Sequence, residues 1–317
     1  MPTFFISKES SNIIKGLACM LIILHHYCQS LNGLNVSNFI IDTIALRGGV
    51  TGVAIFFFLS AYGLSESQSK KRSNFIEFVK RRLSKVFIPL VITNLIYYFI
   101  LLGNNHMFFS LKTFPLYITN IKILDGVTWF CNVIFFFYLF FYISFLFKKN
   151  TYKTICIVCL TIIYSMFMTH FLKDAPYCVY SIIGFPVGMI ISLYKEFFYK
   201  KYIIKLSISV TFTLFFAAFI FKTYYNLFIG NLYSYFITIF TSYIIYKYQS
   251  KWQTNKFLLS LGKYSYEIYL LHNKFLFFCW KLNIVYWYPI IFVFLIMPSS
   301  IFLQHINNKF DKFILQK

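Results

Sequence analysis

Long continuous runs of apolar residues, separated by shorter polar connections, make up most of this chain of 317 residues. A helix needs about 20 apolar residues to cross the hydrocarbon core of a bilayer. Barrel strands would alternate every second residue, whereas these runs are continuous, and a helix pairs its own backbone groups inside lipid. The pattern predicts an all-α, polytopic membrane bundle with ten spans, over residues 12–30, 48–65, 86–103, 127–147, 154–171, 176–194, 203–221, 226–246, 257–279 and 284–304.

The amino-acid composition is that of a membrane protein. Hydrophobic residues make up 59% of the chain and charged residues only 12%, about half the charged fraction of an ordinary soluble domain. The mean hydropathy is +0.68. An ordinary soluble domain is therefore excluded.

The net charge of +21 could indicate nucleic-acid binding, because basic patches attract phosphate backbones. The positions of the charges favour a membrane topology instead. With both termini inside, the inner connections with their edges and the two tails hold 21 of the 30 Lys and Arg residues. The outer connections hold six, which are Arg47, Lys112, Lys122, Lys173, Lys222 and Lys281. The positive-inside rule therefore predicts that both termini are cytoplasmic.

The chain is expected to form one transmembrane domain over residues 1–317, with no fused soluble domain. The first span has no convincing cleavage site, so we expect it to be retained rather than removed as a signal peptide. The longest inner connection, 66–85, is basic and amphipathic in its second half, which predicts a helix on the inner membrane face that runs into the third span. The seven cysteines show no metal-ligand spacing, so no metal is expected.

Two adjacent histidines, His25 and His26, interrupt the apolar stretch "LACMLIILHHYCQ". Lys15 precedes His26 by eleven positions, about three helical turns, so the two share one face roughly 16 Å apart along the axis. Ionisable residues inside a membrane are candidates for function, and a neutral imidazole can take the proton of a hydroxyl at cellular pH. The alternative is that one histidine makes an interhelical hydrogen bond, which suits His25 better, while Lys15 extends to the interface.

A second group of candidates lies in "FVKRRLSKVFIP". Arg81, Arg82 and Lys85 are close on one predicted helix at the inner face, where they could hold a phosphate group by charge-assisted hydrogen bonds. The alternative is ordinary anchoring by anionic lipid headgroups.

The ninth predicted span contains "KYSYEIYLLH". Glu267 stands at helical spacing from Lys263 and Lys274, and a buried carboxylate is expected to need such a partner. We expect Glu267 to form an ion pair or line a pore, and His272 to belong to a polar network.

Two further stretches supply pore-lining candidates. "FFFLSAYGL" offers Ser60 and Gly63, which suit a close approach of helices. "TWFCNVIFFFY" begins the fourth span with Trp129 at the outer interface and Asn132 just inside it.

Taken in order, these stretches resemble the motifs of the acyltransferase 3 family, multi-pass membrane O-acyltransferases that modify bacterial surface glycans. Lys15 to His26 is similar to the basic-x10-His motif of that family, "FVKRRLSKVFIP" to its Arg-x-x-Arg motif, and "LGKYSYEIYLLH" to its late Tyr-Leu-x-His signature. "VAIFFFLSAYGL" and "WFCNVIFFFY" resemble its second-span and fourth-span motifs. The chain departs from the pattern at Lys15, Lys85 and Ala61, where the family usually has Arg, Arg and Gly.

The resemblance implies transfer of an acetyl group from acetyl-CoA, at the inner face, to a hydroxyl of a capsule, O-antigen or exopolysaccharide. His26 would be catalytic with Lys15 alongside it, and Arg81, Arg82 and Lys85 would bind the donor. The resemblance also implies a place in the bacterial cytoplasmic membrane, beside other glycan-assembly proteins, and no nucleic-acid partner.

Two other functions compete with this interpretation. An exporter of a lipid-linked sugar usually has broken spans in two related halves, but "IIGFPVG" at 182–188 is the one strongly broken span in the pattern. A non-catalytic component of a glycan-assembly complex would not need His26.

Overall fold

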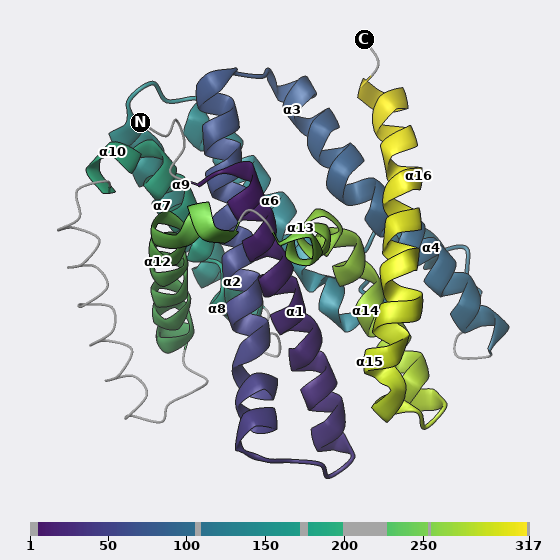
Figure 1. Cartoon of the computed structure of the whole chain (residues 1–317). Helices are drawn as coiled ribbons and strands as arrows, with labels where there is room; N and C mark the ends of the chain where they lie inside the picture. Colours follow the sequence, from purple (N-terminus) through teal and green to yellow (C-terminus); the bar gives the residue numbers. More distant parts are fainter. Residues whose placement is uncertain (1–5, 105–108, 172–176, 199–226, 253–254, 316–317) are drawn as a thin grey trace. The chain divides into compact units, whose positions relative to one another are not determined.

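A computed structural model describes residues 6–104, 109–171, 177–198, 227–252 and 255–315 (Figure 1). Every regular element in these ranges is a helix, as the sequence predicts. The α-helices are α1 (Lys8–Gly33), α2 (Phe39–Lys70), α3 (Phe75–Arg82), α4 (Ile88–Gly103), α5 (Phe114–Ile118), α6 (Trp129–Phe145), α7 (Asn150–Phe171), α8 (Tyr177–Tyr180), α9 (Gly184–Leu193), α10 (Lys195–Phe198), α12 (Leu227–Trp252), α13 (Lys256–Lys263), α14 (Ser265–Lys281), α15 (Tyr288–Ile291) and α16 (Met297–Leu315). Short 3₁₀ turns lie at Gly126–Thr128 and Val285–Trp287, and π-helical turns at Leu83–Phe87 and Phe292–Ile296.

Six helical segments among the described residues are long and apolar enough to cross a membrane. They are Lys8–Gly33, Phe39–Lys70, Phe75–Gly103, Gly126–Phe145, Asn150–Phe171 and Val285–Leu315, and they correspond to the first five predicted spans and the tenth. The predicted count of ten and the cytoplasmic placement of both termini remain predictions.

The other four predicted spans differ from this group. The predicted span 176–194 is interrupted between α8 and α9, and 226–246 lies in α12, which is not among the six. The predicted span 257–279 is not one helix, because α13 ends before Tyr264 and α14 begins after it. The predicted span 203–221 lies outside the described residues.

The amphipathic helix expected in the connection 66–85 is present as α3, which leads into α4 (Figure 1). It begins at Phe75 because the Asn74 side chain caps it, accepting a hydrogen bond from the backbone N–H of Glu77 at 2.8 Å. Residues 66–70, which the sequence assigned to the connection, belong to α2 instead.

Each π-helical turn directly precedes a proline. Pro89 stands at the start of α4, and Pro298 holds the same place in α16. Proline donates no hydrogen bond, and its ring clashes with the carbonyl four residues earlier. The wider turn relieves this clash, and the N–H of Ile88 donates to the carbonyl of Leu83, five residues before it. Proline therefore explains why these two segments are not uniform α-helices.

The chain divides into two compact parts. The first part comprises residues 1–22, 47–72 and 136–263, and the second comprises 23–46, 73–135 and 264–317. The N-terminal half of α1 and the C-terminal half of α2 belong to the first part, and their other halves belong to the second.

In the first part, two glycines allow α9 to lie directly against α2. A side-chain carbon at Gly184 would overlap with the carbonyl oxygen of Ala54, and one at Gly188 would overlap with that of Phe58. The close approach that the sequence predicted at Gly63 is not found in the described part of the chain, where no atom lies within 4 Å of the position its Cβ would take. Small residues do allow α9 to contact α2 closely, as is common between membrane helices. These residues are Gly184 and Gly188 of "IIGFPVG".

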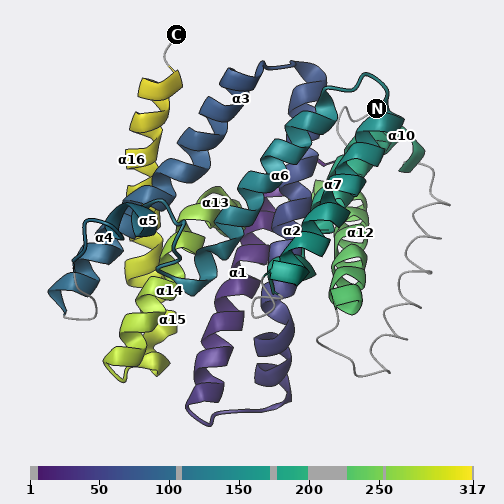
Figure 2. The ribbon, with the colours of Figure 1, turned by 180° about the vertical axis from the view of Figure 1, so that it is seen from behind.

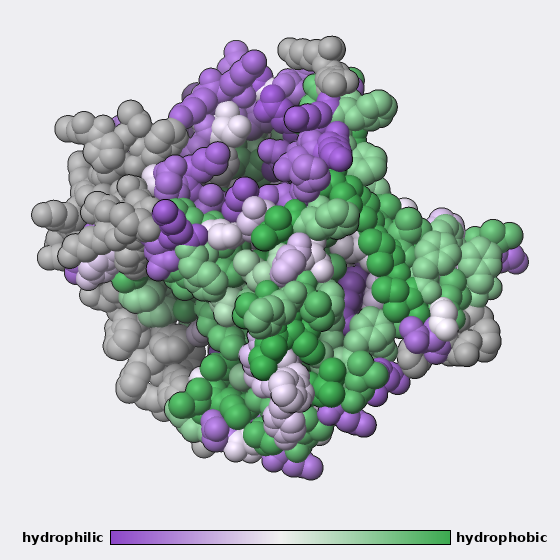
Figure 3. Space-filling model, turned by 45° about the vertical axis from the view of Figure 1, so that its right-hand side comes forward, coloured by the Kyte–Doolittle hydropathy of each residue, from purple (hydrophilic) through white to green (hydrophobic). Residues whose placement is uncertain are grey.

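In the second part, α14 packs against both α4 and α16, and α5 lies against α4 (Figure 2). Large apolar side chains are exposed on α4 and α16, among them Ile96, Phe99 and Phe302. Figure 3 shows hydrophobic residues over much of the face that it presents. Such exposure is expected where a helix faces hydrocarbon rather than water.

We expect Gly188→Ala to destabilise the protein by about 1–3 kcal/mol, because the added methyl group has to displace backbone of α2. Gly63→Ala is the matched control. Its Cβ would meet no atom of the described residues, so this substitution should be neutral or slightly stabilising. Thermal unfolding of the detergent-solubilised variants measures the difference, and equal midpoints for the two variants would contradict the proposed helix contact.

Candidate active site

The second part brings together two histidines that are far apart in the sequence. The rings of His26 in α1 and His272 in α14 lie 5.3 Å apart between centroids, tilted by 34°. His272 is fully buried and His26 is half-buried. Two basic nitrogen-containing rings in contact, within apolar helices, form the core of the candidate site.

His25 has a different role from its neighbour. Its ring meets the His26 ring edge-on, with 4.7 Å between centroids. Its Nδ1 donates to the carbonyl of Ile44 in α2 at 3.2 Å. His25 therefore makes the interhelical hydrogen bond that the sequence predicted for one of the two histidines, and it holds α1 beside α2.

The hydrogen bonds around Gln29 determine which nitrogen of His26 is free. The Gln29 amide Nε2 donates to the carbonyl of Ala45 at 3.3 Å, which turns its Oε1 toward His26. His26 Nδ1 lies 3.1 Å from that oxygen and therefore carries the ring hydrogen. The Nε2 of His26 is consequently the atom with the lone pair. A base oriented by a third group in this way is the usual arrangement for activating a hydroxyl.

His272 is oriented by its own helix. Its Nδ1 donates to the carbonyl of Tyr269 at 2.7 Å, and its backbone carbonyl accepts a hydrogen bond from the Tyr288 hydroxyl at 3.0 Å. The Nε2 is buried and has no hydrogen-bond partner in the described part of the chain. His272 does belong to a polar network, as predicted, and it also presents an unsatisfied acceptor beside His26.

An ion pair lies next to His272 in the sequence. Lys274 Nζ donates to Asp125 Oδ2 at 2.9 Å, and Asn273 Nδ2 donates to Asp125 Oδ1 at 2.6 Å. Both charged side chains are almost completely buried. Burial favours a higher pKa for the Asp125 carboxyl, but the Lys274 ammonium and the Asn273 amide hold that pKa below its ordinary value.

This pair corrects one prediction from the sequence. The carboxylate that binds Lys274 is Asp125, in the connection before α6, and not Glu267 on the same helix. Helical spacing made Glu267 the nearest candidate, but a partner seven positions away along one helix stands about two turns off. Asp125 reaches Lys274 from outside the helix. Glu267 is itself buried in α14.

A network of asparagines fixes the connection that carries Asp125. Asn120 is fully buried and adopts a left-handed conformation, with φ of 64°, which asparagine tolerates better than most residues. Its side chain accepts from Thr128 Oγ1 at 2.8 Å and donates to Asn132 Oδ1 at 3.0 Å, and Asn94 of α4 also donates to it at 3.3 Å. Asn132 donates back to the Asn120 carbonyl at 2.9 Å. These bonds give Asn132 a structural role, and its place in a pore stays a prediction.

Trp129 begins α6, as predicted for the fourth span. It is half-buried, and its ring meets that of Phe130, which in turn contacts Tyr269 edge-on at 5.7 Å between centroids. The Tyr269 hydroxyl donates to the carbonyl of Val127. Trp129 therefore supports the helix end next to the site.

The basic residues predicted to bind the donor lie on α3 and the following π-helical turn. Arg81 pairs with Glu77 at 2.6 Å, and the Arg82 guanidinium lies over the Phe78 ring at 6.0 Å. Lys85 is exposed. Within this cluster, Glu77 is the partner of Arg81.

α14 links this basic segment to the histidine pair. The Tyr266 hydroxyl donates to the carbonyl of Val86 at 2.7 Å, directly after Lys85. Tyr266, Tyr269 and His272 follow one another at intervals of three residues, with ring centroids 6.5 and 5.8 Å apart. Six residues of helix span about 9 Å, so a chain of contacting rings runs along α14 from the segment that follows Lys85 to His272.

Two predicted residues belong to the first part and not to this cluster. Lys15 is half-buried on the N-terminal half of α1. The Ser60 hydroxyl lies 3.4 Å from that of Tyr138, within the same part. The action of Lys15 alongside His26 stays a prediction.

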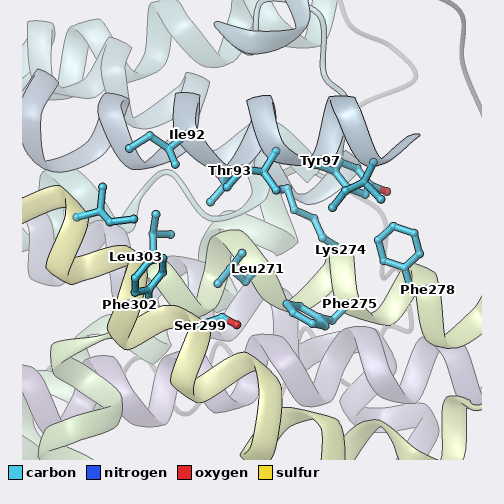
Figure 4. Close-up of a pocket in the computed structure, with 13 residues that line it drawn as sticks. Ile92, Thr93, Tyr97, Leu271, Lys274, Phe275, Phe278, Ser299, Phe302 and Leu303 are labelled. Atoms are coloured by element: carbon cyan, nitrogen blue, oxygen red, sulfur yellow. The ribbon is translucent and has the colours of Figure 1, made fainter. Parts of the chain in front are cut away.

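A cavity of about 360 Å³ lies between α4, α14 and α16 (Figure 4). Its lining is mostly aliphatic and aromatic, with residues Ile92, Thr93, Ile96, Tyr97, Ile100, Leu271, Lys274, Phe275, Phe278, Ser299, Phe302, Leu303 and Ile306. The Thr93 hydroxyl is turned to the carbonyls of its own helix, and the Lys274 ammonium is directed to Asp125, so both offer mainly carbon to the cavity. This lining suits hydrocarbon and offers nothing to the phosphates of a nucleotide.

The sequence interpretation missed three residues that orient the site, namely Gln29, Asp125 and Tyr288. Asp125 could have been found, because the chain has only nine acidic residues, and each one next to an apolar span is unusual. Gln29 stands one helical turn after His26, a spacing at which side chains meet. No signal in the sequence marks Tyr288 among 26 tyrosines.

Asp125→Asn should destabilise the protein by about 3–5 kcal/mol, because it leaves the Lys274 ammonium buried without a counter-charge. The low pKa of Asp125 implies that the pair stabilises the fold above the ordinary carboxyl pKa and that this contribution is lost as the pH falls through the lower value. Thermal unfolding in detergent, repeated over a series of pH values, measures both the destabilisation by Asp125→Asn and the pH dependence of the wild-type protein. Glu77→Gln, which removes the exposed pair with Arg81, is the control and should cost at most about 1 kcal/mol.

A family model described as "Acyltransferase domain" matches residues 8–303. No curated protein and no solved structure matched the chain in the corresponding comparisons. The family match includes α1 with His26 and α14 with His272, and it extends over nearly the whole sequence. The chain therefore belongs to the acyltransferase 3 family.

Proposed function

We propose that this membrane acyltransferase is an O-acetyltransferase that moves an acetyl group from acetyl-CoA to a hydroxyl of a cell-surface polysaccharide or its lipid-linked precursor. The family supports acyl transfer, and the apolar helices support a membrane location. The observation that carries the proposal is the His26 imidazole, whose Nδ1 is occupied by Gln29 and whose Nε2 keeps its lone pair.

The chemistry needs one group that can take a proton and return it. His26 Nε2 accepts the proton of the acceptor hydroxyl while the oxygen forms a bond to the acetyl carbonyl carbon. The carbon–sulfur bond of the thioester then breaks, and the proton held on His26 passes to the departing thiolate. The hydroxyl thus becomes an ester and the donor leaves as a free thiol, with no other reactant required.

The basic segment supplies a place for the donor. Coenzyme A carries several phosphate charges, and Arg81, Arg82 and Lys85 place three cationic side chains within five positions of one segment. The hydrogen bond from the Tyr266 hydroxyl to the Val86 carbonyl joins this segment to α14. Acetyl-CoA held here by its phosphates would extend its acetyl group toward His26. We place this segment on the cytoplasmic side of a bacterial inner membrane, where acetyl-CoA is available.

We infer the identity of the acceptor from the family resemblance. We infer where the acceptor meets the protein from the position of His26, which lies in the half of α1 farther from the predicted inner face. The polysaccharide class, the inner-membrane location and the action of Lys15 beside His26 are parts of the same proposal. An exporter of lipid-linked sugars would not need the orientation that Gln29 gives to the His26 ring.

His26→Ala should lower the O-acetyl content of the surface glycan by about 100-fold or more, because general-base catalysis contributes that much. Mass spectrometry of glycan from a deletion strain complemented with each variant measures it. His305→Ala, an exposed histidine on α16, is the matched control and should retain wild-type acetylation. Unchanged acetyl content in His26→Ala, with normal expression and membrane insertion, would defeat the catalytic assignment.

Arg82→Ala should raise the KM for acetyl-CoA about tenfold or more, since hydrogen bonds to charged groups contribute about 1.5–3 kcal/mol. Arg82→Lys should recover part of the loss because it keeps the charge but not the fork of donors. Steady-state kinetics with purified protein measures the effect. Lys112→Ala, in the predicted outer connection, is the control, and an equal rise in KM there would point to general destabilisation instead.

A further inference from the structure

The histidine pair offers two hydrogen-bond acceptors and no donor of its own. His26 Nδ1 is turned to Gln29 on α1, and His272 Nδ1 is turned to the Tyr269 carbonyl on α14. In each ring the hydrogen therefore points back to the helix that carries it. Each Nε2 is left as an acceptor on the side of the ring directed away from its own helix.

Three polar side chains of α14 and α15 next to His272 donate to other groups. The Asn273 amide and the Lys274 ammonium are both directed to Asp125, and the Tyr288 hydroxyl donates to the backbone of His272. His272 is fully buried, and its Nε2 has no partner in the described part of the chain. A buried acceptor without a donor is costly, and a ligand bound at the histidine pair would supply one.

We propose that His272 Nε2 binds a second hydroxyl of the acceptor, adjacent to the hydroxyl that His26 activates. The inference rests on the proposed function and specifies its substrate class, an acceptor with two neighbouring hydrogen-bond donors. One hydroxyl gives its proton to His26 Nε2 and is acetylated. Its neighbour donates a hydrogen bond to His272 Nε2 and remains unmodified, so His272 takes no proton during the transfer.

The geometry favours two adjacent donors over one. The two rings are in contact, with centroids 5.3 Å apart, and a single hydroxyl has only one hydrogen to share between two acceptors. A ligand with one hydroxyl would leave one buried nitrogen unsatisfied. Sites built to hydrogen-bond a substrate hydroxyl reject analogues that lack it more strongly than apolar pockets reject a change of size. His272 is therefore a residue that determines acceptor specificity.

Small alcohols test this without knowledge of the native glycan. The purified protein in detergent is given radiolabelled acetyl-CoA with propane-1,2-diol, propane-1,3-diol or propan-1-ol, and the labelled ester and the free thiol are both quantified. We expect kcat/KM for the 1,2-diol to exceed that for propan-1-ol about tenfold or more, from the gain of one hydrogen bond to a buried acceptor. The 1,3-diol should fall between them.

Substitutions of His272 test whether this side chain causes the preference for the 1,2-diol. His272→Ala should bring kcat/KM for the two diols to the value that the same variant gives with propan-1-ol, chiefly through a higher KM for the diols. His272→Gln, which restores a side-chain acceptor, should recover part of the preference, and His305→Ala should keep all of it. Thermal unfolding of each variant shows whether it is folded.

The outcomes separate this inference from the proposed function. A wild-type enzyme that treats the three alcohols alike, or that releases thiol in a His26-dependent way without acetylating any of them, overturns the diol site. So does a preference that persists in His272→Ala, which would mean that the 1,2-diol is recognised elsewhere. Thiol release that is absent or independent of His26 contradicts the proposed function itself.

Discussion

Every polar group that this chain carries into hydrocarbon has to find its partner within the protein, because lipid offers none. The described structure meets this constraint by several means. Asn120 shares its amide among Asn94, Thr128 and Asn132, and Asp125 is matched to Lys274 and Asn273. His25 uses a backbone carbonyl of the neighbouring helix. The buried Nε2 of His272 is one of several buried side-chain atoms that have no partner in the described part of the chain, and it is the one that lies on a ring beside His26.

The same constraint explains how histidines can be kept among apolar helices. A neutral imidazole costs far less to bury than a charged group, and the hydrogen bonds to Gln29 and Tyr269 each fix one ring in a single tautomer. The buried charges nearby are paired and lie on the other side of α14, where Lys274 reaches Asp125 and also lines the apolar cavity. The ion pair thus ties the helix that carries His272 to the connection before α6.

Much of the fold was predictable because it depends on local pattern. Continuous apolar runs gave the membrane helices, and the unusual place of His26 in such a run marked the site. Prediction failed where tertiary contact decides. The spacing that paired Lys274 with Glu267 was sound for one helix, but it could not show that a loop aspartate 149 positions away reaches the same lysine. Likewise, Gly63 is as small as Gly188, and only packing shows which of them meets a neighbouring backbone. The break between α13 and α14 at Tyr264 could not be predicted from a proline, because the sequence has none there.

The two π-helical turns carry a consequence for how these helices are compared with those of relatives. One extra residue in a turn rotates everything beyond it by about 100° relative to a uniform helix. A helical wheel drawn through Phe75–Gly103 without a break would therefore set Arg82 and Tyr97 at the wrong angle to each other. The π-helical turns before Pro89 and Pro298 therefore shift the helical phase, so residues on the two sides of each turn face directions that a uniform helix would not give them. Alignments of helix faces in this family are best made separately on either side of such prolines.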